Sequence, residues 1–130
     1  MHPFRAAVEG RDLAAAVTLL AEDVVFRSPV VFTPYRGRDA VGAILHAVSE
    51  VFEDFRYVRE VGSPGEPDHL LVFRTRVGGM EIEGIDLLHT ADDGSIDELT
   101  VMVRPLKGAL ALAEAMQAKL AAAAGTPGAG

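Results

Sequence analysis

The clearest pattern of hydrophobic and polar positions lies in residues 70–104, where two alternating runs flank the pair Gly78-Gly79. Glycine supplies without strain the positive φ angles that a two-residue primed turn needs, so this pair predicts a β-hairpin. A third strand is expected to follow after a turn at Asp92-Asp93-Gly94, and Pro105 ends it. The segment is therefore predicted to form three consecutive antiparallel strands.

The side chains set the register of this hairpin. One face would carry Arg74 opposite Glu83 and Arg76 opposite Glu81, which are favourable cross-strand pairs. The other face would carry a largely apolar set, namely Leu71, Phe73, Thr75, Val77, Met80 and Ile82. A slip by one residue would exchange the faces and lose both matches, so we expect this register.

Asp86 falls on the apolar face of the second strand, opposite Leu71. A carboxyl group there is costly unless it is hydrogen-bonded, paired or protonated. Asp86 is therefore either an acid in a pocket or a structural residue, and the pattern leaves both readings open. In the second case the register differs slightly or a backbone group or water satisfies the carboxyl. On the outer face, Ile85 and Leu87 follow the charge pairs, which predicts that a second subunit covers part of that face.

The rest of the pattern predicts helices over residues 3–9, 13–21, 39–53 and 106–120, and strands over 24–28 and 55–61. Residues 30–36 are expected to be a loop or a short irregular strand, and residues 62–67 a loop rich in Gly and Pro. This order predicts an α+β domain whose helices lie on one side of a curved antiparallel sheet. Such a sheet leaves a cavity at its open end, a usual place for a small-molecule site.

Asp86 is the one convincing ionisable group that the pattern directs into this pocket. The rest of the predicted lining is apolar or neutral: Phe26, Ser28, Phe32, Tyr35, Leu45, Val48, Phe52, Phe73, Thr75, Leu88, Leu99, Val101 and Val103. The exposed-looking aromatics Phe32 and Tyr35 would line either the pocket mouth or a subunit contact. Arg104 is expected to point outward into a salt bridge, and His46 to lie on the solvated side of its helix.

Composition narrows the possible functions. The chain has 130 residues and fits one domain over residues 1–120, with a low-complexity and disordered tail over 121–130. A net charge of −7 argues against nucleic acid and anionic membranes as partners. The absence of cysteine removes disulfides and thiolate chemistry and fits a reducing cytoplasm. We find no signal peptide, membrane-spanning stretch, nucleotide-binding motif or metal-ligand spacing among the histidines, so neither cofactor nor metal is expected. Abundant Ala, Gly, Arg and Val are typical of a GC-rich bacterial source.

Three segments resemble the nuclear-transport-factor-2-like superfamily, in particular its SnoaL-like and ketosteroid-isomerase-like branch. They are FRAAVEGRDLAAAVTLLAEDVVFRSP, YRGRDAVGAIL and EGIDLLHTADDGSIDELTVMV, and the resemblance spans residues 4–103. It implies a cone-shaped, strongly curved sheet wrapped around the N-terminal helices and one long helix, a cystatin-like α+β barrel with a C-terminal helix. It also implies a deep pocket and a homodimer formed through the sheet.

The resemblance assigns roles to three positions. Asp86 matches the isomerase acid that stays protonated in an apolar site and donates a hydrogen bond to the substrate oxyanion. The tyrosine that partners that acid matches Phe4, which joins the predicted lining, and the general-base aspartate matches Ser28. Because Phe4 has no hydroxyl and serine is not a base at neutral pH, ketosteroid isomerisation by that mechanism is not expected.

The sequence thus favours a SnoaL-like domain that binds a small hydrophobic molecule in an apolar pocket around Asp86. One alternative is an isomerase or polyketide-cyclase-like enzyme in which protonated Asp86, as the catalytic group, polarises a substrate carbonyl. A second alternative is a non-catalytic dimerisation domain.

Overall fold

The computed structural model describes residues 1–125. Along the chain the elements are α1 (Pro3–Glu9), α2 (Leu13–Thr18), β1 (Leu20–Arg27), β2 (Tyr35–Arg36), α3 (Arg38–Val51), β3 (Glu53–Val61), β4 (Asp68–Val77), β5 (Met80–Thr90), β6 (Ile96–Arg104) and α4 (Leu106–Gly125). The predicted α+β arrangement with a C-terminal helix is confirmed.

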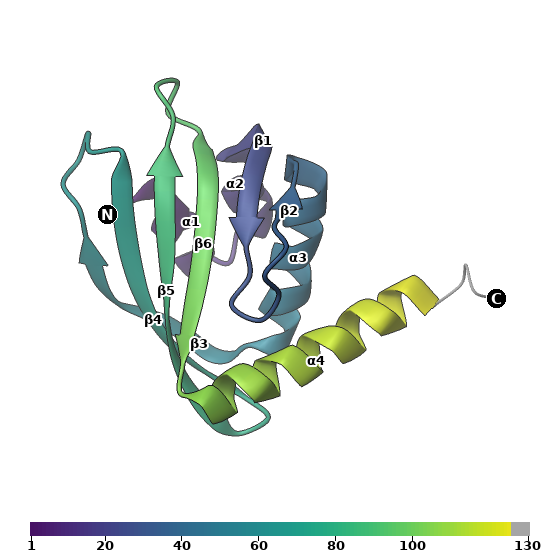
Figure 1. Ribbon diagram of the computed structural model, residues 1–130. Helices are drawn as coiled ribbons and strands as arrows, with labels where there is room; N and C mark the ends of the chain where they lie inside the picture. Colours follow the sequence, from purple (N-terminus) through teal and green to yellow (C-terminus); the bar gives the residue numbers. More distant parts are fainter. Residues whose placement is uncertain (126–130) are drawn as a thin grey trace.

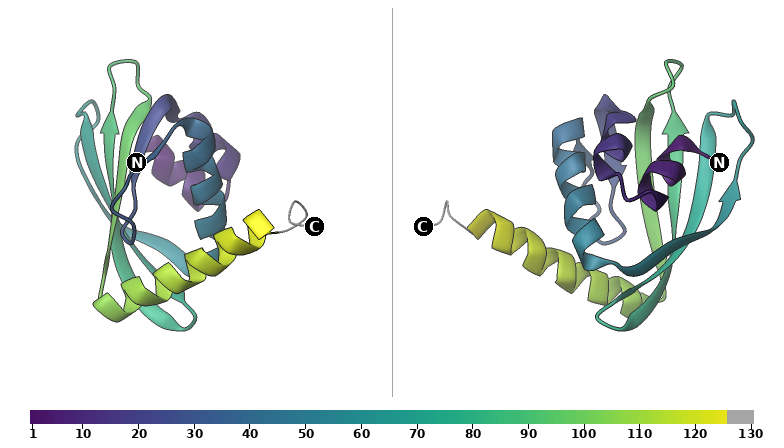
Figure 2. Two further views of the ribbon diagram at one scale, coloured as in Figure 1. Left: turned by 45° about the vertical axis from the view of Figure 1, so that its right-hand side comes forward. Right: turned by 180° about the vertical axis from the view of Figure 1, so that it is seen from behind.

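One sheet carries all six strands in the order β2-β1-β6-β5-β4-β3. It curves around α1, α2 and α3, which lie together on its concave side (Figures 1 and 2). The expected antiparallel meander from β3 to β6 is confirmed. The sheet as a whole is mixed, because β1 pairs in parallel with β6, and it is open with β2 and β3 at its edges.

The central hairpin has the predicted register, with Val77 opposite Met80 and Leu71 opposite Asp86. Its outer face carries the expected charges: Arg74 Nη2 lies 3.2 Å from Glu83 Oε2. Arg104 also points outward, and its Nη1 lies 3.1 Å from Glu83 Oε1. The inner face is closed to solvent from Leu71 to Val77.

Local sequence explains how the helices begin. Pro3 occupies the first turn of α1, where its missing N–H costs nothing. The Asp12 carboxylate accepts a hydrogen bond of 3.0 Å from the Ala15 amide and so caps α2. The third helix, α3, buries the stripe Val41, Ile44, Leu45 and Ala47 against the sheet. His46 lies on its exposed side, as expected.

The second helix is shorter than predicted. Its pattern continues to Ala21, but α2 ends at Thr18 and β1 begins at Leu20. Leu20 is fully buried opposite Ile96, and the Ile96 amide donates to the Leu19 carbonyl over 2.9 Å. Pairing between segments 76 residues apart thus overrides the local helix propensity of Leu19 to Ala21.

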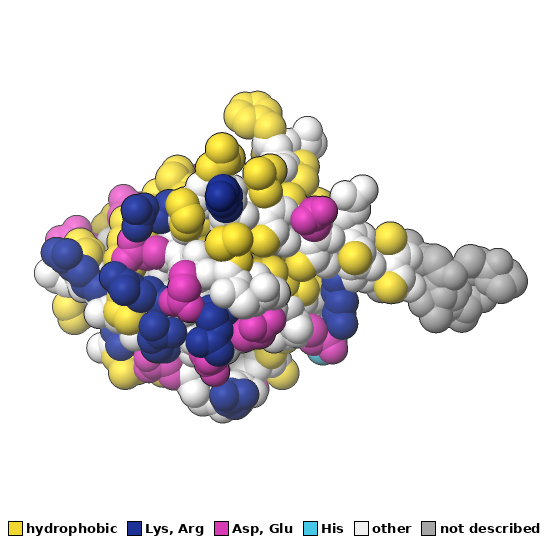
Figure 3. All heavy atoms as spheres, turned by 90° about the horizontal axis from the view of Figure 1, so that it is seen from below, with side chains coloured by type: hydrophobic (Ala, Val, Ile, Leu, Met, Phe, Trp, Pro, Cys, Tyr) yellow, Lys and Arg dark blue, Asp and Glu magenta, His cyan; other side chains and the backbone are white. Residues whose placement is uncertain are grey.

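The last helix runs past the predicted boundary. α4 continues to Gly125, so the first half of the expected disordered tail is helical, and residues 126–130 lie outside the described residues. α4 crosses the lower end of the sheet and then extends away from it (Figures 1 and 2). From below, basic and acidic side chains alternate at the sheet end of the molecule, and apolar side chains are exposed along α4 (Figure 3). No helix among residues 1–125 is long and apolar enough to cross a membrane.

Candidate functional site

A cavity of about 630 Å³ lies between the concave face of the sheet and the helices. Side chains of all four helices and of β1, β3, β5 and β6 border it, and most are apolar. Its volume is in the range of pockets that hold small organic molecules. The predicted lining residues that border it are Phe4, Phe26, Ser28, Leu45, Val48, Phe52, Asp86, Leu99 and Val101.

Six of the predicted lining residues lie elsewhere. Phe73, Thr75 and Leu88 face inward but belong to the packed core beneath the cavity, and the Thr75 hydroxyl donates to the Glu53 carbonyl over 2.8 Å. Tyr35 and Val103 pack at the edge of the core. Phe32 is 99% exposed in the loop between β1 and β2, so it does not line the cavity, and the alternative of a subunit contact stays open for it.

Asp86 lies on the inner face of β5, with Leu71 opposite it on β4 and Val101 opposite it on β6. Its side chain is 7% exposed and borders the cavity. Burial raises the pKa of this carboxyl to about 7, against the opposing effect of one hydrogen bond. Both protonation states are therefore populated near neutral pH.

That hydrogen bond comes from Tyr57 on β3, whose hydroxyl donates to Asp86 Oδ2 over 2.7 Å. Tyr57 is 7% exposed, and burial followed by the neighbouring Asp86 raises the pKa of its hydroxyl, which therefore stays protonated. No other described residue hydrogen-bonds the Asp86 carboxyl. Its Oδ1 is thus free to meet a bound molecule.

Sequence reasoning missed Tyr57. The alternation of residues 55–61 holds the signal, since it places Phe55 and Tyr57 on one face of a strand. However, β3 shifts register against β4 between Glu53 and Arg56 and again between Tyr57 and Arg59. Counting along the strand therefore cannot show that Tyr57 reaches Asp86 two strands away.

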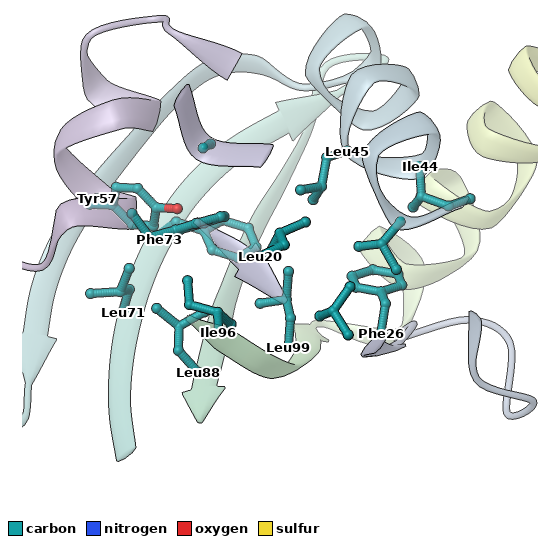
Figure 4. Packing of buried hydrophobic residues seen from close by; sticks show 14 residues of the cluster. Leu20, Phe26, Ile44, Leu45, Tyr57, Leu71, Phe73, Leu88, Ile96 and Leu99 are labelled. Carbon is teal, nitrogen blue, oxygen red and sulfur yellow. The ribbon is translucent and has the colours of Figure 1, made fainter. Parts of the chain in front are cut away.

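Aromatic rings pack together around Tyr57 at this end of the cavity. Phe55 lies 4.9 Å from Tyr57 and 5.0 Å from Phe73, measured between ring centroids, and it stacks on Phe52 at 5.6 Å. Figure 4 shows Tyr57 beside Phe73, with its hydroxyl directed toward the interior of the cluster. The hydrogen bond between Tyr57 and Asp86 is buried, and burial is the main cause of the raised pKa of Asp86.

The two positions that the isomerase resemblance singled out carry no charge. Phe4 is 2% exposed and packs in the core. The Ser28 hydroxyl accepts a hydrogen bond of 3.1 Å from the Val30 amide, which orders the start of the following loop. Neither side chain can remove a proton from a bound molecule at neutral pH.

One group of potential metal ligands occurs within residues 1–125: His89, Asp97 and Glu98, which the spacing of the histidines did not predict. It lies away from the cavity lining. His89 Nδ1 lies 2.6 Å from Asp97 Oδ1, and this contact raises the pKa of His89. The ion pair accounts for the arrangement of His89 and Asp97.

The free energy of unfolding should depend on whether Asp86 is protonated. In the unfolded chain its pKa returns to 3.8, so between pH 3.8 and about 7 the folded protein holds a proton that the unfolded chain has lost. The stability from this proton is complete below pH 3.8 and is lost as the pH rises through 7, at about 1.4 kcal/mol per unit. Relative to wild type, Asp86→Asn should therefore gain on the order of 4 kcal/mol between pH 4 and pH 8 in urea unfolding.

Asp92→Asn, in the exposed turn before β6, is the matched control and should follow wild type at every pH. If the free energies of unfolding of wild type and Asp86→Asn change in parallel with pH, the pKa of Asp86 in the folded protein is not raised.

Comparison with known proteins places the chain in a family. Residues 2–99 match the model of the SnoaL-like domain. The crystal structure of a steroid delta-isomerase from Pseudomonas aeruginosa is 42% identical, with a TM-score of 0.87 over 93% of this chain and 88% of that one. An uncharacterised conserved bacterial protein with a cystatin-like fold, from Silicibacter pomeroyi, is 37% identical, with a TM-score of 0.87 over 95% and 89% of the two chains.

A protein of unknown function with a cystatin-like fold, from Xanthomonas campestris, shares the fold at 23% identity, with a TM-score of 0.66 over 85% of this chain and 92% of that one. A comparison with curated protein sequences finds no significant match. The predicted resemblance is thus confirmed at the level of family and fold, and the chain belongs to the SnoaL-like domain family of the nuclear-transport-factor-2-like superfamily.

Proposed function

We propose that this protein binds a small hydrophobic molecule that carries a hydrogen-bond-accepting oxygen, such as a ketone. The observation that carries the proposal is the Asp86 carboxyl, which faces an apolar cavity and has Tyr57 as its one hydrogen-bond partner among the described residues. A buried polar group without its full set of partners is costly unless a ligand or water completes them. A ligand oxygen would complete them here.

Proton placement decides what this site can recognise. The Tyr57 hydroxyl donates to Oδ2, so a proton on the Asp86 carboxyl is available at Oδ1 to donate into the cavity. Protonated Asp86 would therefore bind a carbonyl oxygen, and ionised Asp86 would repel it. Because the pKa of Asp86 is about 7, affinity for a ketone should depend on pH in the neutral range.

Isomerisation of a steroid-like ketone is the second candidate, and the 42% identity to a protein described as a steroid delta-isomerase favours it. The pair of Asp86 and Tyr57 could polarise the carbonyl, as that chemistry requires. Proton transfer between carbon atoms also needs a base, and the position that the resemblance assigns to the base holds Ser28. We therefore propose binding as the function and expect turnover to be absent or slow.

Two ligands test whether Asp86 recognises a carbonyl oxygen. One is a 3-ketosteroid, which is a hydrophobic ketone, and the other is the matching 3-deoxy steroid, which lacks that oxygen. Wild type should prefer the ketone, and above pH 7 its affinity for the ketone should fall by up to about tenfold per pH unit as Asp86 ionises. Asp86→Leu, which cannot donate, should lose about tenfold in ketone affinity and keep its affinity for the analogue. Asp86→Asn keeps a donor and should bind the ketone independently of pH.

Isothermal titration calorimetry measures these affinities, with Asp92→Asn as the control that should match wild type. Equal affinity of wild type for ketone and analogue at every pH would remove Asp86 from ligand recognition. A β,γ-unsaturated 3-ketosteroid tests the second candidate in the same series, because fast appearance of the conjugated enone would establish isomerisation and contradict the expectation of slow turnover.

A homodimer formed through the outer face of the sheet is also proposed. Val72, Ile85 and Met102 lie opposite one another in a row across β4, β5 and β6, and Leu87 lies in the next row. Met102 is 55% exposed and Leu87 is 38% exposed, so this apolar row meets solvent in the single chain. Charged pairs border it, including Arg74 with Glu83, which is the usual plan of a protein interface.

The dimer predicts a concentration-dependent mass in sedimentation equilibrium. Met102→Asp should convert a wild-type dimer to a monomer, because it places a charge in the centre of the apolar row. Leu110→Asp, at a 57% exposed position on α4, should leave the dimer intact. A wild-type monomer at all micromolar concentrations would contradict the proposed assembly.

A further inference from the structure

The first turn of α1 is attached to β3 and β4 by a cluster of polar side chains outside the site described above. The His2 amide donates to Glu60 Oε2 over 2.9 Å, and Arg5 Nη1 donates to Glu60 Oε1 over 3.3 Å. The ring of His2 also lies against the ring of His69, with 4.8 Å between the centroids. Glu60 belongs to β3 and His69 to β4, so these contacts join the amino-terminal end of α1 to this side of the sheet (Figures 1 and 2).

The bond between His2 and α1 requires a neutral imidazole. Nδ1 of His2 accepts a hydrogen bond of 3.0 Å from the Phe4 amide and so caps the helix. A protonated imidazole carries a hydrogen on both ring nitrogens and accepts none, so a proton on His2 would replace this bond by a contact between two donors. The side chain of Phe4 is buried and borders the cavity. Loss of the cap therefore acts on a wall of the cavity.

His69 is held in place beside His2. Its Nε2 lies 3.0 Å from the Ser63 carbonyl, which can only accept, so Nε2 carries the hydrogen and Nδ1 does not. Nδ1 is buried and has no hydrogen-bond partner among the described residues. Gly62 packs directly on the ring, since a Cβ there would lie 2.6 Å from Cδ2 of His69. These contacts fix the ring of His69 against that of His2.

The charges around His2 decide how it responds to pH. The charged and titratable groups of this cluster are His69 on β4, Glu60 on β3, and Arg5 and the amino group of Met1 on its own segment. Burial and then His69 lower the pKa of His2 below 6.5, the amino group adds to this effect, and Glu60 opposes it. A released His2 regains the pKa of 6.5 and so binds a proton that the attached form does not. Attachment is therefore strongest above pH 6.5 and weakens as the pH falls below it.

We propose that His2 and His69 form a pH-sensitive latch, which holds the first turn of α1 against the sheet at neutral pH and releases it in mild acid. Release frees Phe4 from the wall of the cavity, so the latch controls how fast a molecule enters. This inference goes beyond the proposed function, because it concerns the movement of α1 and does not depend on which molecule the cavity binds.

Hydrogen exchange of single amides, followed by nuclear magnetic resonance at pH 7.5 and pH 5.5, tests the latch without a ligand. The Phe4 and Ala6 amides both donate to His2. After correction for intrinsic exchange rates, their protection factors should be about five- to tenfold lower at pH 5.5 in wild type. His2→Asn keeps a capping side chain that does not titrate, so its protection factors should be equal at both pH values. Equal protection at both pH values in wild type, or the same fall in His2→Asn, would overturn the latch.

Two further variants assign the effect. His46→Asn removes an exposed histidine of α3 and should behave as wild type does. His69→Gln keeps a neutral polar side chain at the buried position and should show a smaller fall, because a charged His2 then meets no second imidazole. If His69→Gln is folded by circular dichroism and shows the full fall, His69 is not part of the latch.

Entry of a neutral dye tests the link between the latch and the cavity. The association rate of N-phenyl-1-naphthylamine, followed by stopped-flow fluorescence, should rise in wild type between pH 7.5 and pH 5.5 by about the factor by which protection falls. The rate should not change in His2→Asn. An unchanged rate in wild type would show that molecules do not enter beside α1. If protection falls as expected but the dye does not bind at either pH, the apolar site of the proposed function is wrong and the latch stands.

Discussion

The burial of the Asp86 carboxyl is the constraint on which the rest of this site depends. The hairpin register turns the carboxyl inward, and the curved sheet brings Tyr57 within 2.7 Å of it from two strands away. The rings of Phe55 and Phe73 pack against Tyr57, and both Tyr57 and Asp86 are buried. An ionised carboxylate is poorly stabilised in such surroundings, which raises the pKa to about 7, so that a protonated, hydrogen-bond-donating form is populated at neutral pH.

Features fixed by neighbouring residues could be predicted from the sequence. The turn at Gly78-Gly79 and the charge pairs beside it defined one register, and that register alone placed Asp86 on the inner face. Features that depend on distant pairing could not be predicted. Leu20 joins a strand because it pairs with Ile96, and Tyr57 reaches Asp86 across a strand whose register shifts twice. Alternation correctly turned Phe73 and Leu88 inward, but it does not distinguish the wall of a cavity from the core beneath it.

Family membership explains the architecture, but the chemistry of the site depends on its individual residues. The position that the resemblance assigns to the tyrosine partner of the acid holds Phe4, and a hydroxyl reaches Asp86 from Tyr57 on β3 instead. The position assigned to the base holds Ser28, whose hydroxyl accepts a hydrogen bond from the Val30 amide. Among the three positions that the resemblance assigns, Asp86 can hold an oxygen and Ser28 cannot remove a proton at neutral pH.

A ¹³C nuclear magnetic resonance titration of the aspartate carboxyl carbons tests this account most directly, with the Asp86 signal assigned by its loss in Asp86→Asn. The account predicts a midpoint near pH 7 for Asp86 in wild type. It predicts a still higher midpoint in Tyr57→Phe, because the hydrogen bond from Tyr57 stabilises the ionised form. A midpoint near 3.8 in wild type would show that water or another group stabilises ionised Asp86, and would contradict a raised pKa caused by burial.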